Sequence, residues 1–184
     1  MAPLGKIKTG KVVPSRAPGV QLDPPSTALA LDNAEYAPDQ LPGLVCRLKD
    51  PKTAALLFRS GKVVCTGAKS IEAVGRAVDI VTSRIEASGV KVDRNPEITV
   101  QNIVASADLH ADLNLNAIAI GLGLEKVEYE PEQFPGLVYR MDNPKVVVLL
   151  FGSGKLVCTG AKKPEDAERA VDQITEELQG LGLL

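Results

Sequence analysis

Apolar residues in the second half of the chain form short runs that are rich in β-branched side chains and bounded by turn residues. These runs predict five strands, at 97–105, 126–129, 137–141, 146–151 and 156–159. Pro, Gly, Asn and Ser residues separate the last three of them, at 135–136, 142–144 and 152–154. Because such short turns join neighbouring strands, we expect antiparallel pairing.

Apolar residues at helical spacing predict two helices in the same half. A short helix covers 113–124 and ends in a Gly-rich stretch. A longer helix begins at Pro164, and Glu165 and Asp166 in its first turn complement the helix dipole. The face of this helix that we expect to be buried consists of Ala167, Ala170, Val171, Ile174 and Leu178.

The chain is a tandem duplication. Residues 36–79 align with residues 129–172 without a gap, at an offset of 129 − 36 = 93, and 27 of the 44 aligned positions are identical. The sequence therefore predicts two repeats, 1–92 and 93–184. Residues 1–30 are the atypical part of the first repeat, and the sequence leaves their order open.

Each repeat reads as strand, helix, four antiparallel strands and helix, which makes the expected fold class α+β. Two such halves related by a pseudo-twofold axis would form a ten-stranded curved antiparallel sheet with helices on one side. Strand 146–151 is apolar on both faces, since Val147, Leu149 and Phe151 alternate with Val146, Val148 and Leu150. These two groups predict an apolar open face, and a large exposed apolar face marks a binding surface. The alternative is that another segment of the chain covers this apolar face. Only the first ~30 residues are not already assigned to the sheet and helices and could do so.

Composition argues against an enzyme. The chain has one histidine, His110, and its three cysteines, Cys46, Cys65 and Cys158, show no metal-ligand spacing. The run 152–155 lacks the spacing of a phosphate-binding loop and reads as a hairpin turn. We therefore expect no catalysis, no metal and no cofactor. No apolar run approaches a membrane span and the N-terminus lacks a signal-peptide core, so a cytoplasmic protein is expected.

Three strings in the second repeat are specific: VQNIVAS, QFPGLVYRMDNPK and LLFGSGKLVCTGAKK. With their counterparts in the first repeat they resemble the TATA-box-binding protein family in its archaeal form, from Tyr36 onward. The resemblance implies a saddle whose concave sheet binds an A·T-rich TATA element in the minor groove and kinks the DNA. It also implies recruitment of transcription factor B and, through it, RNA polymerase. Such a general transcription initiation factor would be cytoplasmic and associated with the nucleoid.

The same resemblance assigns DNA-binding roles to residues of both repeats. Phenylalanine wedges fall at Phe134 and Phe151 in the second repeat, beside Pro135; in the first repeat Phe58 keeps its place, whereas Leu41, beside Pro42, replaces the other. Asn102 matches the asparagine that donates to the minor-groove acceptors. Val104, Val157 and Val64 match the valines that pack on the groove floor, and the hydroxyls beside them are Thr159 and Thr66. The leucines that flank the wedges are Leu149 and Leu56. The cations that match backbone contacts are Arg140, Arg47, Lys155, Lys62, Lys162 and Lys69.

Charge is distributed unevenly between the repeats. The net charge is −2, but residues 1–92 carry 13 basic and 8 acidic groups, and residues 93–184 carry 8 and 15. In the family, acidic residues near the second wedge loop contact transcription factor B, and Glu130 and Glu132 match them. The acidic helix that begins at Pro164 has a simpler interpretation, in which its charged side chains only form a solvated outer face. Homodimerisation of the free protein through its apolar face also stays open.

The first repeat departs from the family pattern at its start. Aligning Val12 with Ile103 requires a two-residue slip and places Thr9, Gly10 or Lys11 near the missing asparagine. Pro24 and Pro25 stand where the second repeat has Ala117 and Ile118, so the front of the first helix is in doubt. Divergence and a local sequence error both explain this segment. If its strand does not pair, the alternative function is a divergent paralogue that acts as a protein-binding adaptor with weakened DNA binding.

Overall fold

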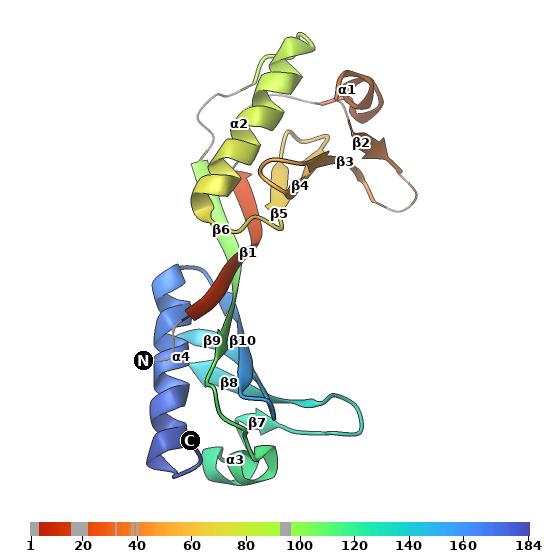
Figure 1. Ribbon diagram of the computed structural model, residues 1–184. Coiled ribbons are helices and arrows are strands. Elements are labelled where there is room, and N and C mark those ends of the chain that lie inside the picture. The colour runs from red at the N-terminus through yellow and green to blue at the C-terminus, as the bar shows by residue number, and fades with distance from the viewer. Residues whose placement is uncertain (1–3, 16–21, 32, 38, 40, 93–96) are drawn as a thin grey trace. The chain divides into compact units, whose positions relative to one another are not determined.

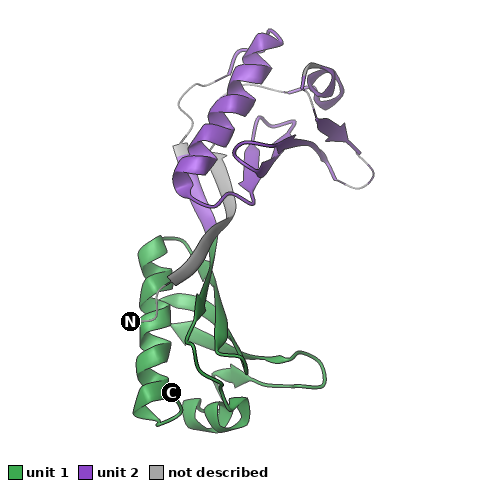
Figure 2. Cartoon of the chain, in the orientation of Figure 1, with its two compact units in different colours: residues 1–8, 102–184 green, residues 9–101 purple. Residues whose placement is uncertain are grey.

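The computed structural model describes residues 4–15, 22–31, 33–37, 39, 41–92 and 97–184. The chain divides into two compact units (Figure 2): residues 1–8 with 102–184 form unit 1, and residues 9–101 form unit 2. These limits differ from the repeat boundary after residue 92, which stays a prediction. The expectation about residues 1–30 lies partly outside the described residues.

Unit 1 contains every strand and helix that the sequence predicts for the second repeat (Figure 1). Its elements are β6 (Glu97–Asp108, which begins in unit 2), α3 (Leu115–Leu122), β7 (Val127–Glu128), β8 (Gly136–Asp142), β9 (Lys145–Phe151), β10 (Lys155–Ala161) and α4 (Pro164–Gly180). The strands pair antiparallel in the order β6-β10-β9-β8-β7. The predicted antiparallel arrangement is confirmed.

Helix α4 covers one face of the unit 1 sheet. The apolar residues expected on its buried side, from Ala167 to Leu178, are all fully buried. They pack on β9 and β10, whose inward residues include Val148, Leu150 and Leu156. Burying these side chains removes apolar surface from water, which stabilises the unit and fixes the face of each strand that turns to the helix.

Unit 2 repeats this architecture. Its elements are β1 (Leu4–Ser15, which begins in unit 1), α1 (Pro24–Ala30), β2 (Ala34–Tyr36), β3 (Gly43–Leu48), β4 (Thr53–Phe58), β5 (Val63–Thr66) and α2 (Ile71–Ala87). The strand order is β2-β3-β4-β5-β1. Helix α2 begins at the N-cap Ser70, whose hydroxyl accepts a hydrogen bond from the Ala73 N–H at 3.1 Å. Its buried face, Val74, Ala77, Val78, Val81 and Ile85, lies 93 residues before that of α4.

The register of β1 corrects the expected slip. Val12 lies opposite Cys65 of β5, and Ala105 of β6 lies opposite Cys158 of β10. Because 105 − 12 and 158 − 65 both equal 93, β1 occupies the place of β6 without a shift. The predicted two-residue slip was wrong. The pattern of apolar residues specifies register only weakly in a strand that contains Gly and several Lys residues.

Two consequences follow from this register. The strand that the adaptor alternative required to be unpaired is present and pairs with β5. Along the unbroken strand, Thr9 stands at the position of Asn102, and Lys11 stands at the position of Val104.

The proline pair starts α1 and does not interrupt it. Pro24 and Pro25 occupy the first two helical positions, where the missing N–H groups would have no partner in the helix. Asp23 is the N-cap, and its carboxylate accepts hydrogen bonds from the backbone N–H and the hydroxyl of Ser26. Helix α1 therefore begins two positions later than α3, which is capped by Asn114.

The fold class is confirmed as α+β, with an antiparallel sheet in each unit and the long helix on one of its faces. All three cysteines are buried and free, as expected for a chain without a disulfide framework. Burial raises the pKa of the Cys65 and Cys158 thiols to about 11, because the charged thiolate is disfavoured away from water.

Candidate nucleic-acid interface

The sheet face opposite α4 in unit 1 is lined by half-buried side chains. Along β9, Val146, Val148 and Leu150 are buried against the helix, whereas Val147, Leu149 and Phe151 are partly exposed. The sequence predicted that these two groups of apolar residues lie on opposite faces of the strand. Since partly exposed residues continue on both neighbouring strands, they form a surface, which we call the open face.

Strand register places the residues of the open face in two rows. In one row Leu149 lies between Val138 of β8 and Val157 of β10, and Val157 lies opposite Ser106 of β6. The second row runs from Arg140 through Val147 and Thr159 to Val104. The face is therefore apolar along its middle, with hydroxyl groups toward β6 and a cation near the outer edge.

Two phenylalanine rings stand together at one end of the open face. Phe134 and Phe151 have ring centroids 5.9 Å apart and meet edge to face at an interplanar angle of 67°. Phe134 lies in the turn before β8 and is 38% exposed, which is unusual for a large aromatic side chain. Its ring thus packs against a second ring and keeps a large exposed fraction.

Gly136 makes this arrangement possible. It lies opposite Phe151 in the β8–β9 ladder, and a Cβ atom there would come within 2.7 Å of the Phe134 ring and 2.9 Å of the Phe151 ring. Gly43 in unit 2 is similar, because its Cβ would lie 3.3 Å from the Phe58 ring. The glycine of the Phe-Pro-Gly string therefore leaves the room that the rings occupy.

Asn102 is held by a bulge in β10. The pairing of β10 with β6 shifts between Thr159 and Ala161, and Gly160 between them has a φ of 99°. The freed Gly160 N–H donates to Asn102 Oδ1 at 2.7 Å, and Asn102 Nδ2 lies 3.4 Å from Thr159 Oγ1. The carbonyl end of the amide thus accepts a hydrogen bond and the NH₂ end donates one, which leaves the second N–H of Nδ2 on the open face.

The two arginines predicted to contact a DNA backbone each form an ion pair. Arg140 Nη2 lies 3.1 Å from Glu128 Oε2 and 3.2 Å from Oε1, and Arg47 Nη2 lies 4.0 Å from Glu35 Oε2. All four side chains are well exposed, so solvent screens both pairs. The remaining predicted cations, Lys62, Lys69, Lys155 and Lys162, are exposed.

Unit 2 carries a matching face. Leu56 lies opposite Val64 and Ala54 opposite Thr66. Phe58 ends β4 opposite Gly43, as Phe151 ends β9 opposite Gly136. Leu56, Phe58 and Thr66 are half-buried, whereas Val64 is only 7% exposed.

The turn before β3 in unit 2 matches the turn before β8 in unit 1. Leu41 is half-buried in that turn and donates its N–H to the Ala37 carbonyl at 3.0 Å. Phe134 donates in the same way to Glu130 at 2.9 Å. Pro42 and Pro135, which follow these residues, are exposed.

The acidic pair predicted to contact a protein partner lies in the turn before β8. Glu130 and Glu132 are exposed, and the turn closes through the Gln133 N–H, which donates to the Glu130 carbonyl at 2.9 Å. The pair therefore stands beside Phe134 with both carboxylates open to solvent.

Some residues of the site were missing from the sequence-based selection. Val138 and Ser106 lie in the rows of the open face, and strand alternation was the signal that could have found them. Glu128 pairs with Arg140, but no pattern in the sequence marks that contact, because it depends on how β7 and β8 pair.

His110, the single histidine, is exposed after β6, with Nδ1 3.6 Å from Asp108 Oδ1.

Metal and membrane features are absent from the part of the chain that the structure describes. No three or more His, Cys, Asp or Glu side chains gather there in a way that could hold a metal ion. None of the described helices combines the length and the apolar character that a membrane crossing requires.

The fold and this site define a two-repeat α+β protein with an apolar, partly exposed sheet face and a wedge-like aromatic pair. The family model for "Transcription factor TFIID (or TATA-binding protein, TBP)" matches residues 8–87 and 97–181. The chain belongs to this family, which consists of DNA-binding transcription factors and is not a class of enzymes. The first match begins inside β1 and continues through Pro24 and Pro25.

Similar proteins cover nearly the whole chain. TATA-box-binding protein E of Halobacterium salinarum is 61% identical over 182 residues, 99% of this chain and 98% of its own. The TATA-box-binding protein of Archaeoglobus fulgidus is 61% identical over 179 residues, 97% of this chain and 98% of its own. The solved structure of the TATA-binding protein of Methanococcus jannaschii matches with a TM-score of 0.83 at 53% identity, covering 96% of this chain and 99% of that one.

Proposed function

We propose that this protein is a general transcription initiation factor that binds an A·T-rich TATA element through the minor groove. The observation that carries the proposal is the open face, on which Val104, Leu149, Val157 and Phe151 are partly exposed and not covered by α4. An apolar surface pressed on the groove floor would bury the G N2 amino group of a G·C pair without a partner. A·T pairs have no such donor and are therefore preferred.

Phe134 and Phe151 are the wedges in this proposal. Their rings contact each other on the open side of the sheet, and both side chains are exposed or partly exposed. Inserting such rings into a base step separates two stacked base pairs and kinks the duplex toward the major groove. In unit 2, Leu41 and Phe58 have the same role, and Leu41 offers less stacking surface.

Asn102 reads the centre of the site. Gly160 donates to its Oδ1, and its NH₂ group donates one hydrogen bond to Thr159, so one N–H is left for the acceptors A N3 and T O2. Arg47, Arg140 and the exposed lysines of both units contact the phosphates, which orients the protein without reading sequence.

The protein partner in this proposal is transcription factor B, which then brings RNA polymerase to the promoter. Glu130 and Glu132 support this role because both carboxylates are exposed beside the wedge loop. A basic surface of the partner would pair with them. Reaction chemistry has no part in the proposal, since binding and bending require neither catalysis nor a cofactor.

A gel-shift experiment tests DNA binding. A TATA duplex and a duplex with G·C pairs at the same positions are titrated with the protein at several salt concentrations, with and without transcription factor B. Tight binding to the TATA duplex alone supports the proposal. Binding to transcription factor B without A·T-selective DNA binding would overturn it and favour the adaptor function.

Phe151→Ala tests the wedge. Fluorescence transfer between dyes at the two ends of a TATA duplex should show that bending is lost, while circular dichroism shows an intact fold. Phe151→Leu, which keeps an apolar side chain, is the matched control and should retain part of the bend. Unchanged bending with Phe151→Ala would remove this residue from the wedge role.

Glu130→Arg combined with Glu132→Arg tests the partner site. The double variant should bind the TATA duplex normally and form the ternary complex with transcription factor B at a clearly higher protein concentration. A normal ternary complex would exclude both residues from the partner site. Sedimentation of the free protein, with Phe151→Ala beside it, tests whether the open face also forms a homodimer.

A further inference from the structure

Unit 1 has a polar cavity beside α4, and Arg140 of its lining also has a role in the proposed function. Its volume is about 350 Å³, and it lies where the end of β8 and the β8–β9 turn meet the last turns of α4. The polar residues of its lining are Lys126, Tyr139, Arg140, Asp142, Asn143, Gln173, Glu176 and Glu177.

Hydrogen-bond acceptors dominate this cavity. The Tyr139 hydroxyl donates to Glu177 Oε2 at 3.0 Å, which fixes the position of that carboxylate. Gln173 Oε1 is buried and has no hydrogen-bond partner among the described groups. An unpaired buried acceptor is costly, and Gln173 lines the cavity, so turning its side chain toward a donor that enters the cavity would relieve this cost.

The charges of the lining favour a cation. Three carboxylates, Asp142, Glu176 and Glu177, face two cations, Lys126 and Arg140, and the Arg140 guanidinium is already engaged by Glu128. Glu176 and Glu177 also lie in the last turn of α4, which contains no basic residue. The negative end of a helix dipole stabilises a cation and destabilises carboxylates. Glu176 and Glu177 are therefore electrostatically unfavourable at this end of α4, and a bound cation would offset that cost.

Unit 2 shows which cation fits between helix and strand at this point. At the offset of 93, Arg84 of α2 replaces Glu177, and Cys46 of β3 replaces Tyr139. The Arg84 guanidinium lies beside Cys46, and its Nη1 is buried. Unit 2 therefore carries its own guanidinium where unit 1 has acceptors and a cavity.

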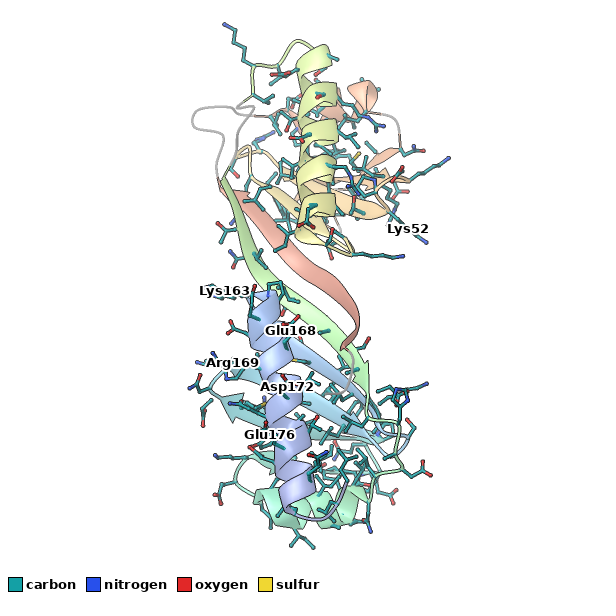
Figure 3. All side chains as sticks on the ribbon, turned by 60° about the vertical axis from the view of Figure 1, so that its left-hand side comes forward. Lys52, Lys163, Glu168, Arg169, Asp172 and Glu176 are labelled. Carbon is teal, nitrogen blue, oxygen red and sulfur yellow. The ribbon has the colours of Figure 1, made fainter. Side chains whose placement is uncertain are left out.

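A stripe of acidic residues leads along α4 to the cavity. Figure 3 shows Glu168, Asp172 and Glu176 on successive turns of this helix. Among the described residues, no lysine or arginine forms a salt bridge with any of the six acidic side chains of α4. A chain segment that places a basic residue in the cavity would thus meet further carboxylates along the helix.

We propose that this cavity binds the arginine side chain of a basic segment of a partner protein. A guanidinium has five donors in a planar fork and suits a lining with several carboxylates, such as Glu176 and Glu177, whereas an ammonium is a compact point charge. The site lies on the α4 side of the unit 1 sheet, and the open face is on the other side. Because Arg140 lines the cavity and is also a proposed phosphate contact, the test variants are placed at residues without a proposed role in DNA binding.

Nuclear magnetic resonance titration of the full chain tests the proposal. The probes are three capped pentapeptides, Gly-Ser-X-Ser-Gly, in which X is arginine, lysine or citrulline. The arginine peptide should shift the Gln173 side-chain amide and the backbone amides of 139–143 and 176–177, and bind about fivefold more tightly than the lysine peptide. Citrulline, which has the same shape without the charge, should not bind.

Glu176→Gln is the informative variant, and Glu168→Gln is its matched control, because it removes one exposed charge from the same helix outside the cavity. Glu176→Gln should weaken binding of the arginine peptide about tenfold, and Glu168→Gln less than twofold. Glu177→Arg copies the arrangement of unit 2 and should abolish binding by filling the cavity, with thermal melting as the check on folding.

Equal affinity for the arginine and lysine peptides, or equal loss in Glu176→Gln and Glu168→Gln, would overturn the cavity proposal in favour of general acidity. The absence of localised shifts at millimolar peptide would overturn it outright. A gel shift with the TATA duplex should be unchanged in all three variants, so failure here is distinguishable from failure of the proposed DNA-binding function.

Discussion

Arg140 on β8 reaches Glu128 on the edge strand β7, with Nη2 3.1 Å from Oε2. Arg47 and Glu35 form the same contact 93 residues earlier, at 4.0 Å. An exposed pair of this kind contributes at most about 1 kcal/mol to stability. The position of the Arg140–Glu128 pair matters more. The Glu128 carboxylate binds the guanidinium of Arg140, which in the proposed function contacts a DNA phosphate.

Glu128→Gln should tighten binding to duplex DNA by about two- to fivefold at low salt, since the Arg140 guanidinium is released and one negative charge is removed. The logarithm of the binding constant should also fall more steeply with the logarithm of salt concentration, because one more cation neutralises a phosphate. Fluorescence anisotropy over a salt series measures both.

Glu125→Gln is the control for this experiment, since it removes an exposed carboxylate that has no salt bridge to a described cation. It should change the affinity through net charge alone and leave the salt slope near that of the wild type. Weaker DNA binding by Glu128→Gln would show that Glu128 positions Arg140 for DNA and does not compete with it.

Gly136→Ala should separate the two phenylalanine rings. The added methyl group would meet Phe134 at 2.7 Å, Phe151 at 2.9 Å and the Leu150 carbonyl oxygen at 3.2 Å. Relieving these contacts costs about 1–3 kcal/mol of unfolding free energy. Urea unfolding measures this loss, and fluorescence transfer should show reduced DNA bending.

Gly75→Ala, in α2, is the matched control for the added methyl group. Nothing lies within 4 Å of its Cβ position, so the change should stabilise the protein by about 0.5–1 kcal/mol through helix propensity. Wild-type bending and stability in Gly136→Ala would contradict the view that this glycine leaves room for the rings.

Asn102→Asp should separate the structural role of this side chain from its proposed role in binding. The aspartate keeps an oxygen acceptor for the Gly160 N–H but loses the NH₂ group and adds a negative charge. Urea unfolding should therefore change little, whereas affinity for the TATA duplex should fall at least about tenfold. Asn102→Ala should lose both binding and about 1 kcal/mol of stability. Equal DNA affinity for Asn102→Asp and the wild type would exclude Asn102 from base reading.

Tyr139 should make the protein sensitive to alkaline pH. Burial, the hydrogen bond to Glu177 and the negative charge of that residue raise the pKa of Tyr139 from 10.0 to about 12. The unfolded chain then loses this proton before the folded chain does. The stabilising contribution is complete below pH 10 and is lost as the pH rises from 10 to about 12.

The measurement is the free energy of unfolding in urea from pH 8 upward, compared between the wild type and Tyr139→Phe. Other groups titrate in the same range, so the difference between the two proteins carries the effect. It should shrink above pH 10, since the phenyl ring of the Tyr139→Phe variant has no proton to lose. A constant difference would show that the Tyr139 pKa is the same in both states.

Much of the fold follows from local pattern. The alternation in 146–151 separates buried from open-face residues correctly, because successive side chains of a strand point to opposite faces. The buried face of α4 was predicted residue by residue for the same kind of reason, since residues three and four apart share one side of a helix. The proposed roles in DNA binding rest on family resemblance and stay predictions.

The sequence by itself determined the duplication, the fold class and which residues turn inward, because these depend on periodicity and composition along the chain. Only the tertiary structure decided the register of β1, the pairing of Arg140 with Glu128 and the contact of Phe134 with Phe151. Each of these depends on how segments distant in sequence align through backbone hydrogen bonds. The amino-acid sequence does not specify this alignment directly, and β1 has too few apolar residues for their pattern to indicate its register.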